Sequence, residues 1–370
     1  MQKPVFVTGG CGFVGRHLVK KLLAKGDSIW ILDNLSTGKH PDVWLQHDRR
    51  QEHDGVIQYA INGAQEVVFI RMDALNFFIE QINKASRLAI PAFSDIYHLA
   101  SIVGGRELID GDPILVATDF GIDALFFVWV TRNKDAIDRI MYASSSAAYP
   151  IHLQNVEHQV AIAMKEDMIR FDEGLGQPDM TYGWSKLSGE FLSRLAAKKY
   201  GLHVACIRPF SGYGEDQDIT YPVPAIARRI AKRENPVEVW GSGQQGRDFV
   251  HIDDCIDAMF TVLDYVKDGS GVNIGSGALT SFIELIRLFA KIEGYTPEIK
   301  PLLDKPVGVT SRYSDPNLIS SFGWHPAISI TEGMTRVLAY AKDESRSVPG
   351  SYDTLKKLFA DPKKDALTSE

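Results

Sequence analysis

The stretch Thr8-Gly9-Gly10-Cys11-Gly12-Phe13-Val14-Gly15 follows a short β-rich run, residues 4–8, and leads into a helical pattern over residues 15–24. Glycines at 9, 12 and 15 permit a tight turn, a close approach of the backbone to a pyrophosphate, and close packing of helix on strand. The start of the helix adds free N–H donors and partial positive charge. A strand, a glycine-rich loop and a helix in this order predict a dinucleotide-binding site.

The second strand-like run, residues 28–32, ends at Asp33, 18 residues after Gly15. A carboxylate at this place can bind a ribose 2′-hydroxyl and repel a 2′-phosphate. We therefore expect NAD rather than NADP. Asp73, after the run 67–71, has two interpretations: it lies near the adenine edge, or it caps the next helix.

Further strand-like runs follow, with helical stretches between most of them, at residues 67–71, 95–99, 139–143 and 203–208. Continuous apolar strands that alternate with helices are typical of parallel βαβ crossovers. The sequence predicts an α/β fold with a doubly wound parallel sheet. Residues 1–208 form the cofactor-binding domain, with helical returns from the later chain. Residues 209–343 form a smaller carboxyl-terminal substrate-binding domain, and residues 344–370 form a polar tail.

Two polar stretches, residues 40–66 and 151–179, are longer than ordinary connections between elements. They are either active-site lids or surface insertions. The histidines of the first stretch, His40, His47 and His53, have irregular spacing, so we expect no metal site there. Phe126, Phe127 and Trp129 are expected in the core or at a subunit interface.

Composition narrows the class of protein. The 370 residues are 45% hydrophobic and 24% charged, which is typical of a globular chain, and the net charge of −7 gives no field that attracts nucleic acid or acidic membranes. Three cysteines without a CxxC pair favour a reduced, cytoplasmic setting. Cys11 is expected to fill the glycine turn rather than to react. We see no export or membrane element.

Tyr182 and Lys186 stand four residues apart in a segment with helical periodicity. This spacing puts both side chains on one helix face, where an ammonium lowers the pKa of a phenol and makes it a usable proton acceptor. The run Ser144-Ser145-Ser146 follows the strand at 139–143, at the edge where open α/β sheets bind ligands. A serine hydroxyl there can bind the same substrate oxygen. Together these residues predict acid–base chemistry on an alcohol.

The glycine motif, the serine after a central strand and Tyr-x-x-x-Lys resemble the extended short-chain dehydrogenase/reductases, the family of nucleotide-sugar epimerases and dehydratases. The resemblance covers about residues 4–340, and its later marks are the segments 208–214, 241–254, 273–276, 305–312 and 323–326. It implies a Rossmann domain and a nucleotide-diphosphate sugar as substrate. It also implies a homodimer formed through helices near residues 113–131 and 182–199.

The resemblance assigns candidate roles residue by residue. The catalytic residues are Tyr182, Lys186 and Ser145. The NAD-binding residues are Gly9, Gly12, Phe13, Val14, Gly15, Asp33, Asn34, Asp73, Leu99, Ala100, Tyr182 and Lys186. The substrate-binding residues are Ser146, Gly104, Gly105, Ser211, Tyr221, Arg247 and Arg312, the two arginines on the diphosphate.

The reaction type depends on what surrounds the common oxidation of a sugar hydroxyl. Dehydratases of the family carry an acid where this chain has Ala147. The segment 100–105 resembles GDP-mannose 3,5-epimerase and GDP-fucose synthase, but their catalytic Cys falls at Ala147, and their Lys or His falls near Tyr221. Removing a proton from a carbon beside a ketone needs such a base.

Inversion at C4 needs no further base, and the segment 31–38 resembles the UDP-sugar 4-epimerases. We expect an NAD-dependent 4-epimerase, an isomerase of carbohydrate metabolism, that works through a transient 4-keto intermediate with hydride returned from NADH. Alternatives are a GDP-mannose 3,5-epimerase-like activity, an NAD(P)-dependent 4-keto-sugar reductase, and a non-catalytic NAD-binding protein. Ser211 and Asp119 stand where relatives often have Asn. The base and the sugar stay open.

Overall fold

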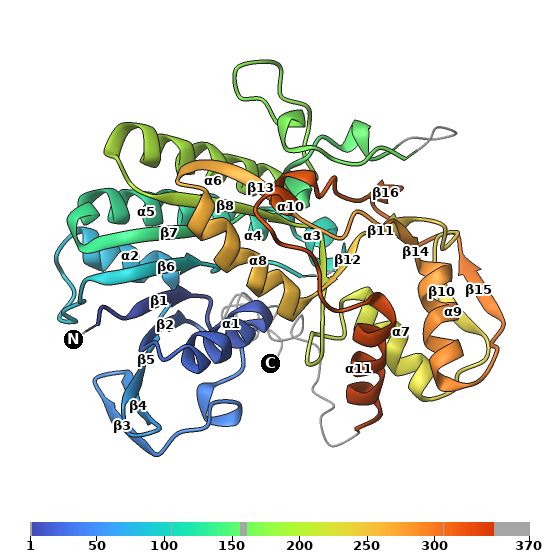
Figure 1. Cartoon of the computed structure of the whole chain (residues 1–370), viewed down its shortest axis with the longest axis horizontal. Helices are drawn as coiled ribbons and strands as arrows, with labels where there is room; N and C mark the ends of the chain where they lie inside the picture. Colours follow the sequence, from blue (N-terminus) through green and yellow to red (C-terminus); the bar gives the residue numbers. More distant parts are fainter. Residues whose placement is uncertain (1, 105, 156–160, 306, 344–370) are drawn as a thin grey trace, which may run out of the picture.

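The central feature of the computed structural model is a nine-stranded sheet with the strand order β13-β8-β7-β6-β1-β2-β5-β4-β3 (Figure 1). The structure describes residues 2–104, 106–155, 161–305 and 307–343. The expected tail, 344–370, lies outside these residues. The strands of this sheet are β1 Val5–Thr8, β2 Ile29–Asp33, β3 Arg49–His53, β4 Val56–Ile61, β5 Gln65–Arg71, β6 Phe93–His98, β7 Ile137–Ala143, β8 Val204–Pro209 and β13 Asp268–Ile274.

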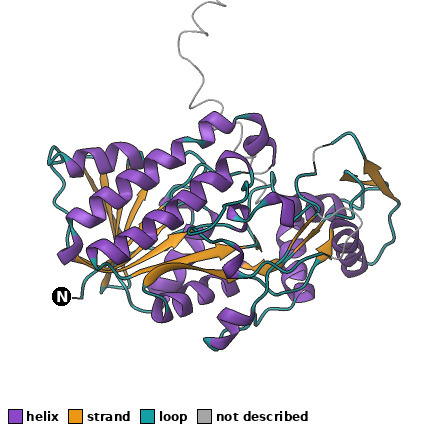
Figure 2. Cartoon of the chain, turned by 90° about the horizontal axis from the view of Figure 1, so that it is seen from above, coloured by secondary structure: helices purple, strands orange, loops and turns teal. Residues whose placement is uncertain are grey.

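Helices cover both faces of this sheet (Figure 2). On one face α2, α5 and α6 pack side by side over a cluster that contains Phe77, Phe126 and Trp129. On the other face α1 and α8 pack together over a second cluster. The strands from β13 to β5 pair in parallel, so the predicted doubly wound sheet is confirmed. The helices are α1 Phe13–Ala24, α2 Ala74–Ile82, α3 Arg106–Gly111, α4 Pro113–Val116, α5 Thr118–Arg132, α6 Met180–Tyr200, α7 Pro222–Ala231, α8 Ile252–Tyr265, α9 Phe282–Glu293, α10 Asn317–Ser321 and α11 Ile330–Lys342.

The carboxyl-terminal part holds a separate apolar cluster built mainly by α7, α9 and α11. Its short strands pair in three small sheets, β10 with β15, β11 with β14 and β16, and β12 with β9. However, β13 and α8 lie within the range 209–343 and join the large sheet and its helical layer. The part of the chain after residue 209 therefore adds a strand as well as a helix to the cofactor-binding domain. The strands of the small sheets are β9 Ser211–Tyr213, β10 Val237–Trp240, β11 Gly246–Arg247, β12 Phe249–His251, β14 Thr280–Ser281, β15 Ile299–Leu302 and β16 Ser311–Arg312.

The stretch 40–66 is a surface insertion. It supplies the antiparallel hairpin β3–β4, which pairs with β5 and extends the sheet at the edge opposite β13. The stretch 151–179 behaves differently, because Met164 pairs with the segment that follows β16. The Met164 N–H donates to the Tyr313 carbonyl at 2.9 Å, and the Asp315 N–H donates to the Met164 carbonyl at 2.8 Å. This second insertion ties the two parts of the chain together.

The helical segment Pro113–Arg132, which spans α4 and α5, is long and apolar enough to cross a membrane, with a mean hydropathy of 1.8 over its most apolar window. The sequence predicts this segment at a subunit interface and no membrane element. In this fold α5 packs between α2 and α6, and Phe126, Phe127 and Trp129 are buried there. Their expected place in the core is confirmed, and core packing accounts for the apolar composition of the helix.

A fully buried ion pair joins α6 to the sheet. Arg208 at the end of β8 donates to Glu190 on α6 through Nε at 2.9 Å and Nη2 at 2.7 Å, and neither side chain is exposed. Ser144 Oγ, just beyond β7, donates to the same carboxylate at 2.5 Å. Arg208 Nη1 donates to Tyr149 Oη at 3.0 Å, and Tyr149 donates to Asn273 of β13 at 2.8 Å. The network spans the carboxyl ends of three neighbouring strands.

Replacing Glu190 by Gln leaves the Arg208 charge buried without its counter-ion. We expect a loss of about 3–5 kcal/mol in the free energy of unfolding, measured by urea denaturation. The matched control is Glu173→Gln, which removes an exposed ion pair to Arg170 and should cost at most about 1 kcal/mol. Equal losses of unfolding free energy in the two variants would show that the buried pair of Glu190 and Arg208 contributes no more to stability than an exposed ion pair.

Candidate functional site

The glycine loop has the geometry that a dinucleotide needs. Gly9 has a φ of +69°, and a Cβ there would lie 2.8 Å from the Ala100 backbone nitrogen. A Cβ on Gly15 would collide with the Gly9 carbonyl, whereas one on Gly12 would meet only that carbonyl, at 3.3 Å. Gly12 caps α1 without a side chain, and the first turn has no acidic residue. The helix start, where Phe13 and Val14 lie, is thus suited to a pyrophosphate.

Asp33 connects the end of β2 to this loop. Its carboxylate accepts from the Cys11 N–H at 2.9 Å and from the Leu35 N–H at 2.7 Å, and burial raises its pKa despite these bonds. Asp73 accepts from the Leu75 N–H and caps α2, so the N-cap interpretation is confirmed. Asn34 Nδ2 also donates to Asp73, at 3.1 Å.

Thr8 fixes the backbone on the opposite side of the loop. Its Oγ1 accepts from the Leu99 and Ala100 N–H groups at 3.2 Å each and lies 2.8 Å from His98 Nδ1. Cys11 is fully buried, and burial raises its pKa well above the usual range. An unreactive thiol that fills the turn is consistent with the expectation from the sequence.

The structure brings the three predicted catalytic residues together. Tyr182 and Lys186 lie one turn apart on α6, with the Lys186 Nζ 5.7 Å from the centre of the Tyr182 ring. The Ser145 side chain lies near Tyr182 and lowers the pKa of its phenol. Ser145 caps the short 3-10 helix Ser146–Ala148 and accepts from the Ala147 N–H at 3.1 Å. A proton acceptor and a second hydroxyl can therefore bind one substrate oxygen.

Burial dominates the electrostatics of this group. It raises the pKa of Tyr182, while Lys186, Ser145 and Arg312 act in the opposite direction. The lowering by Lys186 that the sequence predicts is present, but burial outweighs it. Burial also disfavours the charged form of Lys186. Its interactions with Tyr182, Asp123 and Asp119 act in the opposite direction, and the pKa of Lys186 is raised overall. Taken together, burial and these neighbouring groups favour a protonated phenol and a charged amine.

Two of the predicted substrate residues, Ser146 and Tyr221, lie close to this centre. Ser146 is buried directly after Ser145. Tyr221 caps α7, and its pKa is raised by burial and by Tyr182, which places a second phenol near the first. Ser211 begins β9, and its N–H donates to the Asp248 carbonyl at 2.9 Å. Gly104 packs against the Leu108 side chain. Gly105 lies outside the described residues.

Arg247 and Arg312 are paired residues of the neighbouring parallel strands β11 and β16, so they lie side by side. Like charges in such positions repel, and an anion between them removes the repulsion. Arg247 Nη1 donates to the Gly246 and Val309 carbonyls at 2.8 and 3.0 Å. Arg312 Nη2 donates to Asp179 at 2.7 Å, and its Nε donates to Gln154.

Sequence reasoning missed Asp179 and Gln154, which place Arg312. Asp179 directly precedes α6 and stands three residues before Tyr182, which is the one signal that could have identified it. Gln154 is fully buried in the insertion 151–179, and its Nε2 donates to the Tyr149 carbonyl at 3.0 Å. The second insertion thus contributes to the site although it is not a separate lid.

A second buried network lies beneath Lys186. His98 Nε2 is 3.2 Å from Asp123 Oδ1, and Tyr142 Oη donates to Asp123 Oδ2 at 2.6 Å. The Lys186 Nζ is 5.7 Å from the centre of the Tyr142 ring. Burial lowers the pKa of His98, so its ring is neutral at pH 7. The network places a carboxylate below the ammonium.

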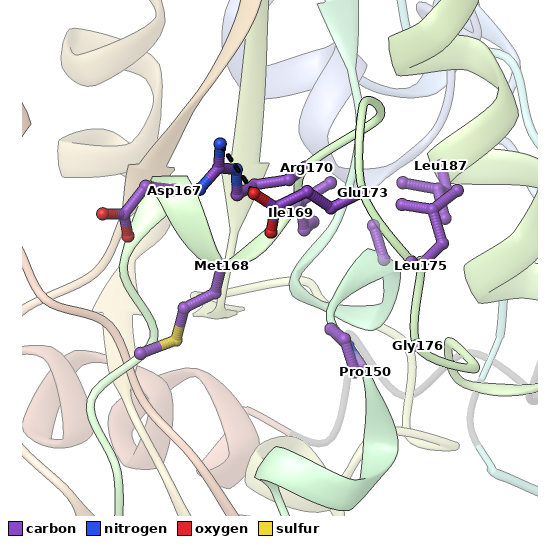
Figure 3. Close-up of a pocket in the computed structure, with 11 residues that line it drawn as sticks. Pro150, Asp167, Met168, Ile169, Arg170, Glu173, Leu175, Gly176 and Leu187 are labelled. Carbon is purple, nitrogen blue, oxygen red and sulfur yellow. Dashed lines mark ion pairs between the residues drawn. The ribbon is translucent and has the colours of Figure 1, made fainter.

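A cavity of about 180 Å³ is lined by Leu187 of α6, by Ala148 and Pro150, and by residues 167–170 and 173–176 (Figure 3). Arg170 and Glu173 form an ion pair at its rim, with nitrogen and oxygen 2.9 Å apart. None of the predicted catalytic residues lines this cavity. Within the described residues, no three His, Cys, Asp or Glu side chains are grouped to hold a metal ion.

A sequence model of the NAD-dependent epimerase/dehydratase family matches residues 5–275. A putative UDP-glucose 4-epimerase of Methanocaldococcus jannaschii is 29% identical over 354 residues, which cover 93% of this chain and 100% of that protein. The GDP-L-colitose synthase of Yersinia pseudotuberculosis is 26% identical and covers 68% of this chain and 82% of its own length.

Solved structures show the same fold. The UDP-glucose 4-epimerase of Thermotoga maritima, solved with UDP-glucose, superposes with a TM-score of 0.73 at 24% identity, over 91% of this chain and 98% of that one. The dTDP-glucose 4,6-dehydratase of Streptomyces venezuelae, solved with NAD, gives 0.74 at 19% identity, over 92% and 97%. Enzymes with different reactions thus share this architecture.

Gly15→Ala should abolish NAD binding, because the added Cβ collides with the Gly9 carbonyl and displaces the loop. Titration calorimetry with NAD measures the effect. Gly174→Ala is the control, since that glycine has open space around it and should bind NAD like the unaltered protein. Tight binding by Gly15→Ala would refute the placement of the cofactor.

Proposed function

The chain belongs to the NAD-dependent epimerase/dehydratase family, and we propose that within this family it is a nucleotide-sugar epimerase that inverts C4. The observation that carries the proposal is the group formed by Ser145, Tyr182 and Lys186, with the apolar Ala147 beside it. Ala147 is 2% exposed and offers neither an acid nor a thiol. The group can exchange one proton with a sugar hydroxyl and has no further base at that position for C3 or C5.

Each side chain has a distinct role in this proposal. NAD, when bound, supplies the hydride acceptor and donor. Tyr182 takes the proton of the C4 hydroxyl and later returns it to the oxygen of the transient 4-keto sugar. Ser145 donates to the same oxygen, and Lys186 stabilises the phenolate by its charge. Inversion follows when the keto sugar turns over between the two proton transfers.

Arg247 and Arg312 fit the diphosphate of the substrate. Their adjacent positions on β11 and β16 concentrate two permanent charges. The ion pair between Arg312 and Asp179 connects the proposed diphosphate site to the start of α6. The diphosphate and the reacting carbon of the substrate would therefore bind to neighbouring parts of the protein.

A 4-keto-sugar reductase is the second candidate. The raised pKa of Tyr182 favours it, because a protonated phenol is ready to donate to a keto oxygen. The Tyr221 phenol near Tyr182 is a candidate for the extra base of a 3,5-epimerase, and its raised pKa argues against that role.

We further propose a cytoplasmic homodimer. Apolar side chains remain exposed on two helices that pack against each other, Phe120 and Val128 on α5 and Trp184 and Phe191 on α6. A second copy that packs the same two helices against them would cover these side chains.

Tyr182→Phe should reduce turnover at least 1,000-fold and leave NAD and nucleotide-sugar binding nearly unchanged, since it removes one proton-transfer group and little volume. The assay incubates the protein with UDP-, GDP- and dTDP-sugars and follows products by NMR together with nicotinamide absorbance. Inversion at C4 without net NADH change supports the epimerase. Stoichiometric NADH consumption supports the reductase, and full activity of Tyr182→Phe would refute the proposed role of the tyrosine.

Arg247→Met and Arg312→Met should each weaken binding of a nucleoside diphosphate about 10- to 150-fold, the range expected for loss of about 1.5–3 kcal/mol from charge-assisted hydrogen bonds. NAD affinity should not change. Arg50→Met in the β3–β4 hairpin is the control, because the described ion pairs of that arginine are to Asp42 and Glu52 of the same insertion. Unchanged affinity in both site variants would place the diphosphate elsewhere.

A further inference from the structure

Asp216 is a carboxylate of the carboxyl-terminal part that reaches the first helix of the cofactor-binding part. It follows β9, between the predicted substrate residues Ser211 and Tyr221, and its φ of +61° lies in the left-handed region. Its Oδ2 accepts from Arg16 of α1, through Nε at 3.2 Å and Nη2 at 2.8 Å. This ion pair joins residues that stand 200 positions apart in the sequence.

The side chains that surround Asp216 are basic. Besides Arg16, His17 Nε2 lies 3.1 Å from Asp216 Oδ1, and Lys39 Nζ lies 3.7 Å from Asp216 Oδ2. The side chain of Asp216 is 17% exposed, and that of Arg16 is 3% exposed. Removing the carboxylate would therefore leave the guanidinium buried without its counter-ion.

Arg16 also holds the glycine loop. Its Nη1 donates to the Cys11 carbonyl at 2.7 Å, and the Lys39 N–H donates to the same carbonyl at 3.0 Å. The Cys11 N–H donates to Asp33 at 2.9 Å. Both backbone polar groups of Cys11 are thus held by neighbours. Because Gly12, the next residue, caps α1, this hold also orients the N–H groups at the start of the helix.

The segment that carries Asp216 is itself held in place. A Cβ on Gly214 would lie 2.5 Å from the Ile252 side chain, so the backbone runs close against the start of α8. The Gln217 side chain donates to the Gly212 carbonyl at 3.1 Å. Asp216 is therefore a fixed partner for α1.

We propose that Asp216 is a positioning residue for the cofactor. It orients Arg16, which holds the Cys11 carbonyl and with it the N–H groups that would bind the pyrophosphate of NAD. The part of the chain proposed to bind the substrate thus also sets the affinity of the glycine loop for NAD. This role concerns the cofactor alone, so it holds whichever sugar reaction the enzyme catalyses.

Asp216→Asn tests the role of the carboxylate. Asparagine tolerates the left-handed backbone as aspartate does and has nearly the same shape, so the segment should keep its conformation. The neutral amide is a weaker partner for Arg16. Affinity for NAD, measured by titration calorimetry, should therefore fall about 3- to 30-fold. Unchanged affinity would overturn the inference.

The matched control is Asp257→Asn. Asp257 of α8 forms an ion pair with Lys21 of α1 at 2.7 Å, and the other bond of Lys21 is to the Asp253 carbonyl. This pair also joins α1 to the later chain, but it does not hold the glycine loop. The control should bind NAD like the unaltered protein, and an equal loss of affinity would contradict a specific role of Asp216.

A double variant shows whether Asp216 acts through Arg16. Arg16→Lys keeps the charge and loses the planar fork that bonds Asp216 and Cys11 together, so it should weaken NAD binding by itself. Adding Asp216→Asn to Arg16→Lys should then weaken binding less than about twofold further. Fully additive losses would show that Asp216 acts by another route.

Amide hydrogen exchange gives a readout without NAD. The N–H groups of residues 11–15 should exchange faster in Asp216→Asn and in Arg16→Lys than in the unaltered protein, and at the unaltered rate in Asp257→Asn. Urea denaturation shows whether each variant is folded. Exchange that is equally faster over the whole chain, or unchanged at residues 11–15, would refute the positioning role.

Discussion

The geometry of the site depends on the buried ion pair between Glu190 and Arg208. The pair joins the helix that carries Tyr182 and Lys186 to the carboxyl ends of the strands, where parallel sheets bind their ligands. Ser144 Oγ also donates to the Glu190 carboxylate, so this one carboxylate holds both α6 and the turn that carries Ser145. A hydroxyl and a phenol from segments far apart in sequence can hydrogen-bond only if helix and turn are held to each other. The pair is buried away from water, so the hydrogen bonds of Arg208 to its protein partners determine its orientation.

The same network extends to the carboxyl-terminal part. Arg208 donates to the Glu166 carbonyl, and Glu166 accepts from the Asn273 N–H of β13. The insertion that carries Glu166 also carries Gln154, which contacts Arg312. A continuous set of polar contacts therefore runs from the catalytic helix through the insertion to the arginines proposed for the diphosphate. The return of β13 to the large sheet makes this connection possible, because it brings later sequence back beside β8.

Sequence predicted the elements that local chemistry determines. The glycine loop, the strand that ends at Asp33 and the pair Tyr182/Lys186 follow from turn geometry and helical spacing, and the structure has them in place. The return of a strand at Asp268–Ile274 could not be predicted, since its position depends on pairing with β8, more than 60 residues earlier. Gln154 and Asp179 were missed for a related reason. Their partner Arg312 is distant in sequence, and polar residues in long insertions carry no periodic signal.

Local chemistry also does not decide the direction of proton transfer. The phenol, serine and lysine are common to reactions that oxidise, reduce or invert a sugar, so the outcome depends on the charges that surround them. In this chain two carboxylates of α5, Asp123 and Asp119, raise the pKa of Lys186, and burial and Asp119 both raise the pKa of Tyr182. Arg312 acts in the opposite sense and is held by Asp179 at the start of the same helix. An anion that draws this guanidinium toward itself would weaken its effect on Tyr182. Binding of a diphosphate by Arg312, as proposed above, would therefore change the acidity of the Tyr182 phenol.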